Sequence, residues 1–305
     1  MNVARCQGCT RKLPAAAAIC ALLLVIPFWL FPLRIYEVSA ALRLWRAGVR
    51  YERVSGLRTL VRDYCEEGRA CRCVALVHGL GDSAVTWERI LTARGEMRGS
   101  RLYAFNMPGT DGSAPPPTAA GYGIKEQSGA LARAMQSRCA SWTLAGNSLG
   151  GWIAAWTALD WPQGVERLVL IGTAGLRDPS GMSRRSGEAL LEASPETMAL
   201  FMSKAYHRPR KIPPRALAQI SERVRGRPTR AILEAIEDED YLDGHIGKLG
   251  VPTSIIWGAS DGIVPPSQGE LFHRALSGST LDIVPACGHL PQKECPGAVF
   301  KALRR

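Results

Sequence analysis

The stretch LAGNSLGGW, residues 144–152, places one serine, Ser148, among three glycines at the end of an apolar run. It contains the pattern G-x-S-x-G, in which Gly146 and Gly150 flank the serine. The residues before it predict a buried strand, and those after it predict a helix that Pro162 ends. A serine on such a turn has a strained backbone, and close packing of strand on helix leaves room only for glycine beside it. The stretch therefore predicts a nucleophile, provided that the chain also supplies a base, an acid and an oxyanion hole.

The base is expected to be a histidine, because a serine hydroxyl is a weak nucleophile at neutral pH. His289 is the best candidate of the five histidines, since it lies in VPACGHLPQKE, directly after the last predicted strand. A loop at the carboxyl end of one strand can reach a nucleophile at the end of another. Of the other histidines, His207 and His273 are expected to be solvated. His245 flanks the end of an insertion, and His78 is expected to brace a loop.

Asp261 is predicted to orient the base, since it lies in IIWGASDGIVPP, again just past a strand. The other carboxylates are less suitable. Asp282 lies inside a predicted strand, whereas Asp240 and Asp243 belong to an acidic run and its tail and are expected on a solvated face.

The oxyanion hole requires two backbone N–H groups aimed at the developing negative charge. Leu149, directly after the nucleophile, is expected to supply one of them. Leu80 is expected to supply the other from the loop HGLGDS, residues 78–83. Gly79 and Gly81 allow this loop to turn its amide inward.

Buried strands alternate with helices from residue 49 onward, which predicts the α/β class, with a mostly parallel central sheet and helices on both faces. A hairpin broken by Ser-Gly opens this part of the chain. Residues 176–249 interrupt the strand rhythm and look helical, as expected of a lid inserted at the carboxyl ends of the strands. The predicted core is therefore divided into residues 49–175 and 250–305.

Residues 13–33 contain no charged side chain. As a helix with a rise of about 1.5 Å per residue they would span roughly 30 Å, the thickness of a bilayer core. We predict a basic tail at 1–12, a transmembrane anchor at 13–33 and a linker at 34–48. A cleaved signal peptide and a buried helix are the alternatives.

The charge balance, 38 Lys and Arg against 27 Asp and Glu, favours anionic partners. No nucleic-acid-binding signature is present, so a membrane is the expected partner. Three basic residues precede the apolar segment and five follow it closely, which favours a cytoplasmic domain by the positive-inside rule. These five are Arg34, Arg43, Arg46, Arg50 and Arg53.

The nine cysteines show no disulfide framework and are expected to be free thiols or small buried side chains, which also favours the cytoplasmic side. Cys6 and Cys9 form a C-x-x-C, and Cys71 and Cys73 a C-x-C. Neither has the second pair that a zinc site needs. No metal and no organic cofactor are expected.

The motifs together resemble the α/β-hydrolase superfamily, in which the triad follows the chain order Ser, Asp, His. With the apolar segment, they resemble its membrane-anchored monoacylglycerol lipase branch and bacterial relatives. The matching stretches are LVHGLGDSAVTWERI, MPGTDGS, GNSLGGWIAA, LIGTAGL, ASPETM, VPTSIIWGASDGIVP and CGHLPQKECP. The resemblance implies a triad of Ser148, Asp261 and His289. Asn106 departs from the pattern at a structural position where the superfamily often has Asp.

The predicted function is hydrolysis of carboxylic esters, monoacylglycerol-like or otherwise lipophilic, through an acyl-enzyme. Residues 177–230 hold twelve basic and five acidic side chains beside the apolar stretch 198–202, so the lid is a candidate for contact with an anionic bilayer. The alternative is that the apolar stretch packs over the site and the arginines are solvated. Other candidate functions are a C–C bond hydrolase, an aminopeptidase and a non-catalytic membrane-anchored binding protein.

Overall fold

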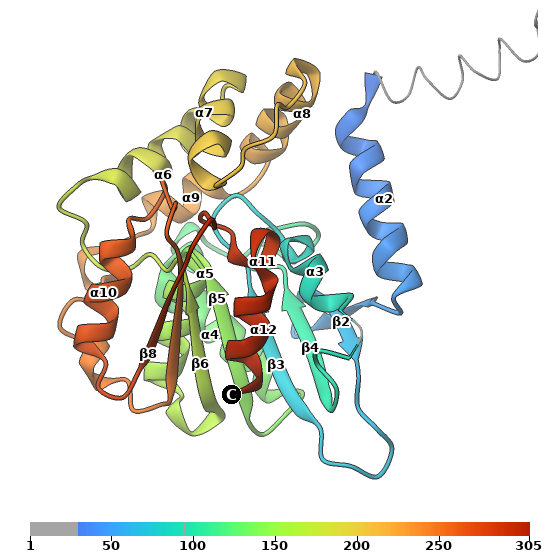
Figure 1. The fold of residues 1–305 in the computed structure, drawn as a ribbon, viewed down its shortest axis with the longest axis vertical. Helices are drawn as coiled ribbons and strands as arrows, with labels where there is room; N and C mark the ends of the chain where they lie inside the picture. Colours follow the sequence, from blue (N-terminus) through green and yellow to red (C-terminus); the bar gives the residue numbers. More distant parts are fainter. Residues whose placement is uncertain (1–29, 94) are drawn as a thin grey trace, which may run out of the picture.

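An eight-stranded sheet forms the centre of the molecule in the computed structural model, which describes residues 30–93 and 95–305 (Figure 1). The strands are β1 (Arg50–Val54), β2 (Leu57–Asp63), β3 (Arg72–Val77), β4 (Ser100–Phe105), β5 (Trp142–Asn147), β6 (Val165–Ile171), β7 (Thr253–Gly258) and β8 (Thr280–Val284). Their spatial order is β1-β2-β4-β3-β5-β6-β7-β8. Only the pairs β1–β2 and β2–β4 are antiparallel in this sheet. The prediction of a hairpin followed by a mostly parallel sheet is confirmed.

Helices cover both faces of the sheet, as predicted (Figure 1). In β3, Ala75 and Val77 join the core formed with α4 (Ile124–Gln136), α5 (Leu149–Asp160) and α10 (Pro266–Ala275). Val74 and Leu76 alternate with them and join the opposite core, formed with α3 (Glu88–Leu91) and α12 (Pro296–Arg304). Because successive side chains of a strand point to opposite faces, an uninterrupted apolar run marks a strand that is buried on both sides. The remaining short helices of the core are α11 (Pro291–Glu294), η1 (Ala84–Trp87), η2 (Ala119–Tyr122) and η3 (Pro162–Gly164).

The segment between β6 and β7 is helical, and we call it the insertion (residues 172–252). It contains α6 (Met182–Glu192), α7 (Pro195–Ala205), α8 (Pro214–Arg225), α9 (Thr229–Glu234), η4 (Asp238–Asp240) and η5 (Ile246–Lys248). Its four α-helices lie beyond one end of the sheet (Figure 1). Ser194 caps the start of α7, since its side chain accepts a hydrogen bond from the N–H of Thr197. Leu190, Met198 and Val224 give the insertion a small core of its own.

Helix α2 (Pro32–Arg46) occupies most of the segment predicted as a linker. Leu44 packs in the core that also contains side chains of α3 and α12. Its other end meets the insertion, where Glu37 pairs with Arg223 at 2.6 Å and Gln219 accepts the N–H of Leu33 at 3.0 Å. The helix therefore connects the start of the described chain to both the core and the insertion.

The predicted anchor at residues 13–33 lies almost entirely outside the described residues. Within 30–93 and 95–305, no helix has both the length and the apolar character needed to cross a membrane.

The expectation of free cysteines is wrong. Disulfides join Cys65 to Cys71, Cys73 to Cys139, and Cys287 to Cys295. The pair at 73 and 139 forms because β3 and β5 run side by side, with Cys73 opposite Trp142. Such a pairing depends on strand order, which cysteine spacing does not contain. The three remaining cysteines, Cys6, Cys9 and Cys20, lie outside the described residues.

Candidate active site

Ser148 occupies the turn between β5 and α5, as predicted. Its φ of 56° and ψ of −123° are a conformation that residues with a side chain rarely adopt. A Cβ at Gly146 would lie 2.1 Å from the carbonyl oxygen of Gly150, and a Cβ at Gly150 would lie 2.4 Å from that of Val77. Both contacts are with backbone that cannot move aside cheaply. The two glycines are therefore steric requirements of the turn.

His289 and Asp261 form a buried pair in the loops that follow β8 and β7. The Nδ1–H of His289 donates to Oδ2 of Asp261 at 2.8 Å. The other carboxylate oxygen, Oδ1, accepts the N–H groups of Ile263 at 2.9 Å and Val264 at 3.0 Å. Because a carboxylate only accepts hydrogen bonds, Nδ1 carries the proton and Nε2 retains the lone pair that a base needs.

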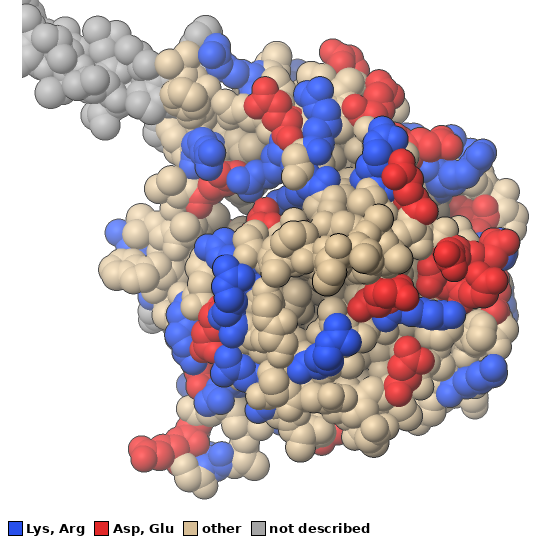
Figure 2. Space-filling model, turned by 180° about the vertical axis from the view of Figure 1, so that it is seen from behind, with Lys and Arg blue, Asp and Glu red and all other residues tan. Residues whose placement is uncertain are grey.

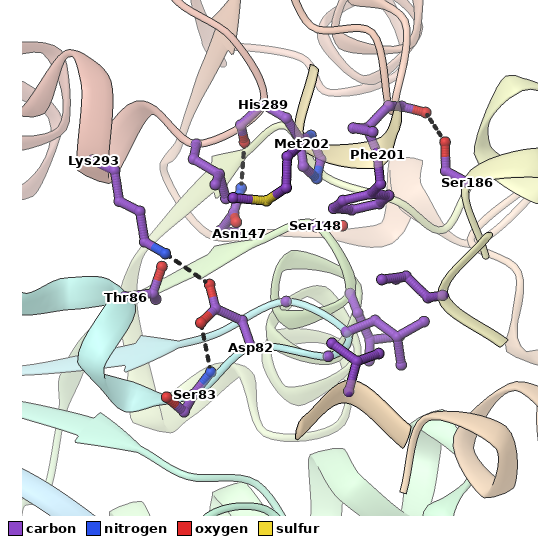
Figure 3. A pocket seen from close by; sticks show the side chains of 18 of the residues that line it. Asp82, Ser83, Thr86, Asn147, Ser148, Ser186, Phe201, Met202, His289 and Lys293 are labelled. Atoms are coloured by element: carbon purple, nitrogen blue, oxygen red, sulfur yellow. Dashed lines mark hydrogen bonds and ion pairs between the residues drawn. The ribbon is translucent and has the colours of Figure 1, made fainter. Parts of the chain in front are cut away.

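The loop bearing His289 is tied to the turn bearing Ser148. Nδ2 of Asn147 donates to the carbonyl oxygen of His289 at 3.0 Å. Ser148 and His289 line the same cavity (Figure 3), although no hydrogen bond joins their side chains in the described part of the chain. Such contacts are often long in the absence of substrate. A Cβ at Gly172 would lie 3.1 Å from Oδ2 of Asp261. The backbone at the end of β6 therefore packs closely against the pair of Asp261 and His289.

The backbone around Leu80 and Leu149 lies beside Ser148, and both leucines line the cavity. Leu149 is the first residue of α5, where N–H groups have no acceptor within the helix. The loop after β3 approaches Ser148 so closely that a Cβ at Gly79 would lie 3.2 Å from the Cβ of Ser148. The two predicted oxyanion-hole donors are thus in segments that contact the nucleophile's turn.

His78 braces the loop after β3, as the sequence predicts. Its Nδ1–H donates to the carbonyl oxygen of Gly79 at 2.8 Å, and its Nε2 accepts the N–H of Met107 at 3.2 Å. Burial lowers the pKa of this imidazole, which keeps it neutral around pH 7. Asn106 has a comparable structural role, because its side chain accepts the N–H of Ala84 at 2.8 Å.

A family model described as "alpha/beta hydrolase fold" matches residues 73–296. The chain belongs to the alpha/beta hydrolase fold family. Lipase 3 of Moraxella sp. is 26% identical to this hydrolase over 231 residues, which cover 72% of each chain. The human monoacylglycerol lipase ABHD6 is 24% identical over 177 residues, 52% of each chain. Lipases are thus among the relatives of this hydrolase.

Two solved structures show the shared fold. A bacterial membrane phospholipase A superposes with a TM-score of 0.73 at 23% identity, over 94% of each chain. The meta-cleavage product hydrolase of Pseudomonas fluorescens IP01 superposes with a TM-score of 0.63 at 23% identity, over 83% of this chain and 94% of that one. At these identities the likeness concerns the fold alone.

The cavity of the hydrolase, about 2700 Å³, lies between the sheet, the insertion and α2. The insertion contributes an apolar group to its wall, consisting of Leu190, Met198, Phe201 and Val224. Charged side chains line other parts of the wall. The site is therefore a large amphipathic chamber with Ser148 on its surface.

Sequence reasoning missed a buried amide network behind the turn. Oδ1 of Asn147 accepts from Nε2 of Gln292 at 3.0 Å, and the same Nε2 donates to Oγ1 of Thr86 at 3.3 Å. Gln292 lies on α11, three residues after His289, and its closeness to the base in HLPQKE was the only signal in the sequence. The network fixes the loop of the base relative to the turn.

The expectation that Asp240 lies on a solvated face is wrong. This residue is 5% exposed, and its carboxylate accepts the N–H of Glu237 at 2.9 Å as part of a helix cap. Its carbonyl oxygen accepts the indole N–H groups of Trp152 at 2.7 Å and Trp156 at 2.6 Å. The acidic run therefore attaches the end of the insertion to α5.

The disulfide between Cys287 and Cys295 closes the segment that carries His289. We expect the double substitution of both cysteines by serine to lower the free energy of unfolding by about 2–3 kcal/mol, the loop entropy of a closure this short. We also expect kcat to fall about tenfold, because the imidazole loses part of its positioning. Denaturant titration and steady-state kinetics measure the two effects.

The matched control is the pair Cys65 and Cys71, a disulfide of similar loop length at the end of β2, outside the cavity. Its removal is expected to affect stability while kcat stays within about twofold. Equal losses of kcat in the two double variants would show that Cys287–Cys295 has no special role in placing His289.

Proposed function

We propose that this hydrolase is a serine esterase that cleaves lipophilic carboxylic esters, with Ser148 as nucleophile, His289 as base and Asp261 as its orienting acid. One observation carries the proposal. A serine on a strained strand-to-helix turn lies on the wall of the cavity that is also lined by a histidine paired with a buried aspartate. The same chain order of the three residues is found in α/β hydrolases generally.

In this mechanism Nε2 of His289 removes the proton from Ser148 as its oxygen attacks the ester carbonyl. Asp261 keeps the proton of the imidazole on Nδ1 and stabilises the imidazolium that forms. The N–H groups of Leu80 and Leu149 stabilise the oxyanion. The imidazolium then protonates the departing alcohol, and water, activated by the same base, releases the acid from Ser148. The mechanism calls for no metal or organic cofactor.

The insertion is proposed to act as a lid over an acyl-binding chamber. Met198, Phe201 and Met202 line the cavity, as the packing alternative supposed, whereas Leu200 of the same stretch points away from it and is 53% exposed. Among the described residues, ion pairs with acidic side chains are formed by Arg177, Arg184, Arg223, Arg227 and Arg230 of this segment. Figure 2 shows acidic side chains interspersed with basic ones on the face it presents. The ion pairs neutralise part of the positive charge of the insertion. They therefore favour a lid that binds an acyl chain over one that presents a uniformly basic surface to a membrane.

A C–C bond hydrolase is the second candidate, because solved structures of meta-cleavage product hydrolases share the fold. An aminopeptidase and a non-catalytic binding protein are the others. We expect the enzyme to hydrolyse monoacylglycerols and long-chain esters faster than short-chain esters, and to leave meta-cleavage products and aminoacyl amides intact. The measurement is kcat/KM over such a panel. A preference for a meta-cleavage product would replace the esterase proposal, and inactivity on every substrate together with no fluorophosphonate labelling would favour the binding protein.

We also propose that residues 13–33 anchor the enzyme in a membrane, with its folded domain on the oxidising side. Helix α2 begins at Pro32, at the end of this segment, and exposes Val38, Leu42 and Trp45. Free cysteines would favour a cytoplasmic domain, whereas the disulfides favour an oxidising compartment, because such bonds persist there. We expect the full chain to remain in membranes after carbonate extraction and a chain lacking residues 1–33 to be released. Trapping of free thiols in intact cells should leave Cys73 and Cys139 unmodified, whereas their modification would place the domain in the cytoplasm.

A further inference from the structure

An ion pair that the mechanism does not use lies on the wall of the active-site cavity. Nζ of Lys293, on α11, is 3.3 Å from Oδ2 of Asp82, in the loop after β3. The side chains are 31% and 28% exposed, and both residues line the cavity. The N–H of Ser83 donates to Oδ1 of Asp82 at 2.8 Å and fixes the carboxylate. In the described part of the chain, Asp82 is the only acceptor within reach of Nζ.

Both members of the pair are charged at neutral pH. Burial raises the pKa of Asp82, but the charges of Lys293 and Arg227 outweigh it and lower the pKa to about 2. Burial lowers the pKa of Lys293, but the charge and hydrogen bond of Asp82, together with Tyr206 and Tyr36, outweigh it and raise the pKa above its ordinary range. The pair thus presents a donor-only ammonium and an acceptor-only carboxylate side by side, with little net charge.

The pair and the apolar wall divide the cavity. In Figure 3, Lys293 and Asp82 lie to the left of Ser148, whereas the ring of Phe201 lies next to Ser148. Phe201 belongs to the apolar group contributed by the insertion. An ester carbonyl at Ser148 would therefore have the charged pair on one side and an apolar ring beside it.

We propose that Lys293 and Asp82 form a subsite for the alcohol part of the substrate, and that this part carries free hydroxyl groups, as in a glycerol ester. The inference rests on the esterase function proposed above and names its substrate class. A hydroxyl group both donates and accepts, so a polyol satisfies the carboxylate and the ammonium together. A phosphate dianion offers only acceptors, so it would bind the ammonium and leave the carboxylate of Asp82 without a donor.

The test compares a monoacylglycerol with the methyl ester of the same fatty acid, which lacks the hydroxyl groups. The wild-type enzyme is expected to prefer the monoacylglycerol in kcat/KM. In Lys293→Met and in Asp82→Asn, the ratio of the two kcat/KM values should fall by about 10- to 100-fold, the usual effect of removing a hydrogen bond to a charged group. Lys293→Arg should keep most of the preference.

The control is Lys301→Met, because Lys301 forms an ion pair with Asp282 at 3.9 Å outside the cavity. It should leave the ratio unchanged. Equal losses for both esters in the Lys293 and Asp82 variants would show that the pair is structural and would overturn the subsite. A wild-type enzyme without preference for the monoacylglycerol would overturn it as well, even if the variants fail to fold. Failure of the wild type to hydrolyse either ester would instead reject the esterase function.

Discussion

Replacing Ser148 with alanine is expected to lower kcat for ester hydrolysis by about 10⁶-fold, the scale known for serine proteases. The substitution removes only the hydroxyl group. Alanine has the same strain as serine at a φ of 56°, so the turn between β5 and α5 should persist. The loss therefore reports the chemistry of the hydroxyl group rather than unfolding. Steady-state kinetics on a long-chain ester and labelling with a fluorophosphonate measure it.

Ser141 offers a matched control, since it lies just before β5, at the opposite end of the strand from Ser148. Its hydroxyl group donates to Glu166 at 2.5 Å outside the cavity, so Ser141→Ala should retain full activity and full labelling. Esterase activity or labelling that survives in Ser148→Ala would remove this residue from the mechanism.

The fold could be predicted from the sequence where the burial of an element produces an apolar pattern within a short stretch of chain. The apolar run through Val74 and Leu76 identified a strand buried on both faces, and the turn at Ser148 followed from its flanking glycines. The loops bearing Asp261 and His289 were found because each follows a strand of a parallel sheet, whose carboxyl ends lie at one edge. The local sequence pattern and the sheet topology together were sufficient to propose the main candidate residues of the site.

Features that depend on contacts between distant segments were not predictable in the same way. The disulfide between Cys73 and Cys139 requires the order of β3 and β5, and the burial of Asp240 requires two tryptophans of α5. The sequence predicts a linker where helix α2 forms, because the stability of this helix comes from packing on the core and the insertion rather than from its own pattern. The pairing of Asp82 with Lys293 is of the same kind, since the two residues are separated by 211 positions.

The second large effect is expected for Asp261→Asn, which should lower kcat by about 10⁴-fold, as the equivalent change does in serine proteases. Oδ1 of Asp261 accepts two backbone N–H groups, from Ile263 and Val264, and Oδ2 accepts the Nδ1–H of His289. An asparagine has only one acceptor oxygen. If its NH₂ group faced the N–H groups of Ile263 and Val264, three donor groups would meet and neither backbone N–H would have an acceptor.

The NH₂ group must therefore face His289, where it donates to Nδ1 and forces the imidazole proton onto Nε2. In that tautomer Nε2 has no lone pair to accept the proton of Ser148, so the geometry survives while the base is lost. Asp282→Asn is the matched control, because Asp282 lies on β8 outside the cavity and pairs only with Lys301 in the described chain. Fluorophosphonate labelling of Ser148 should slow in Asp261→Asn, with unchanged circular dichroism, and remain normal in Asp282→Asn. Labelling and kcat near wild-type values in Asp261→Asn would mean that another group orients the imidazole.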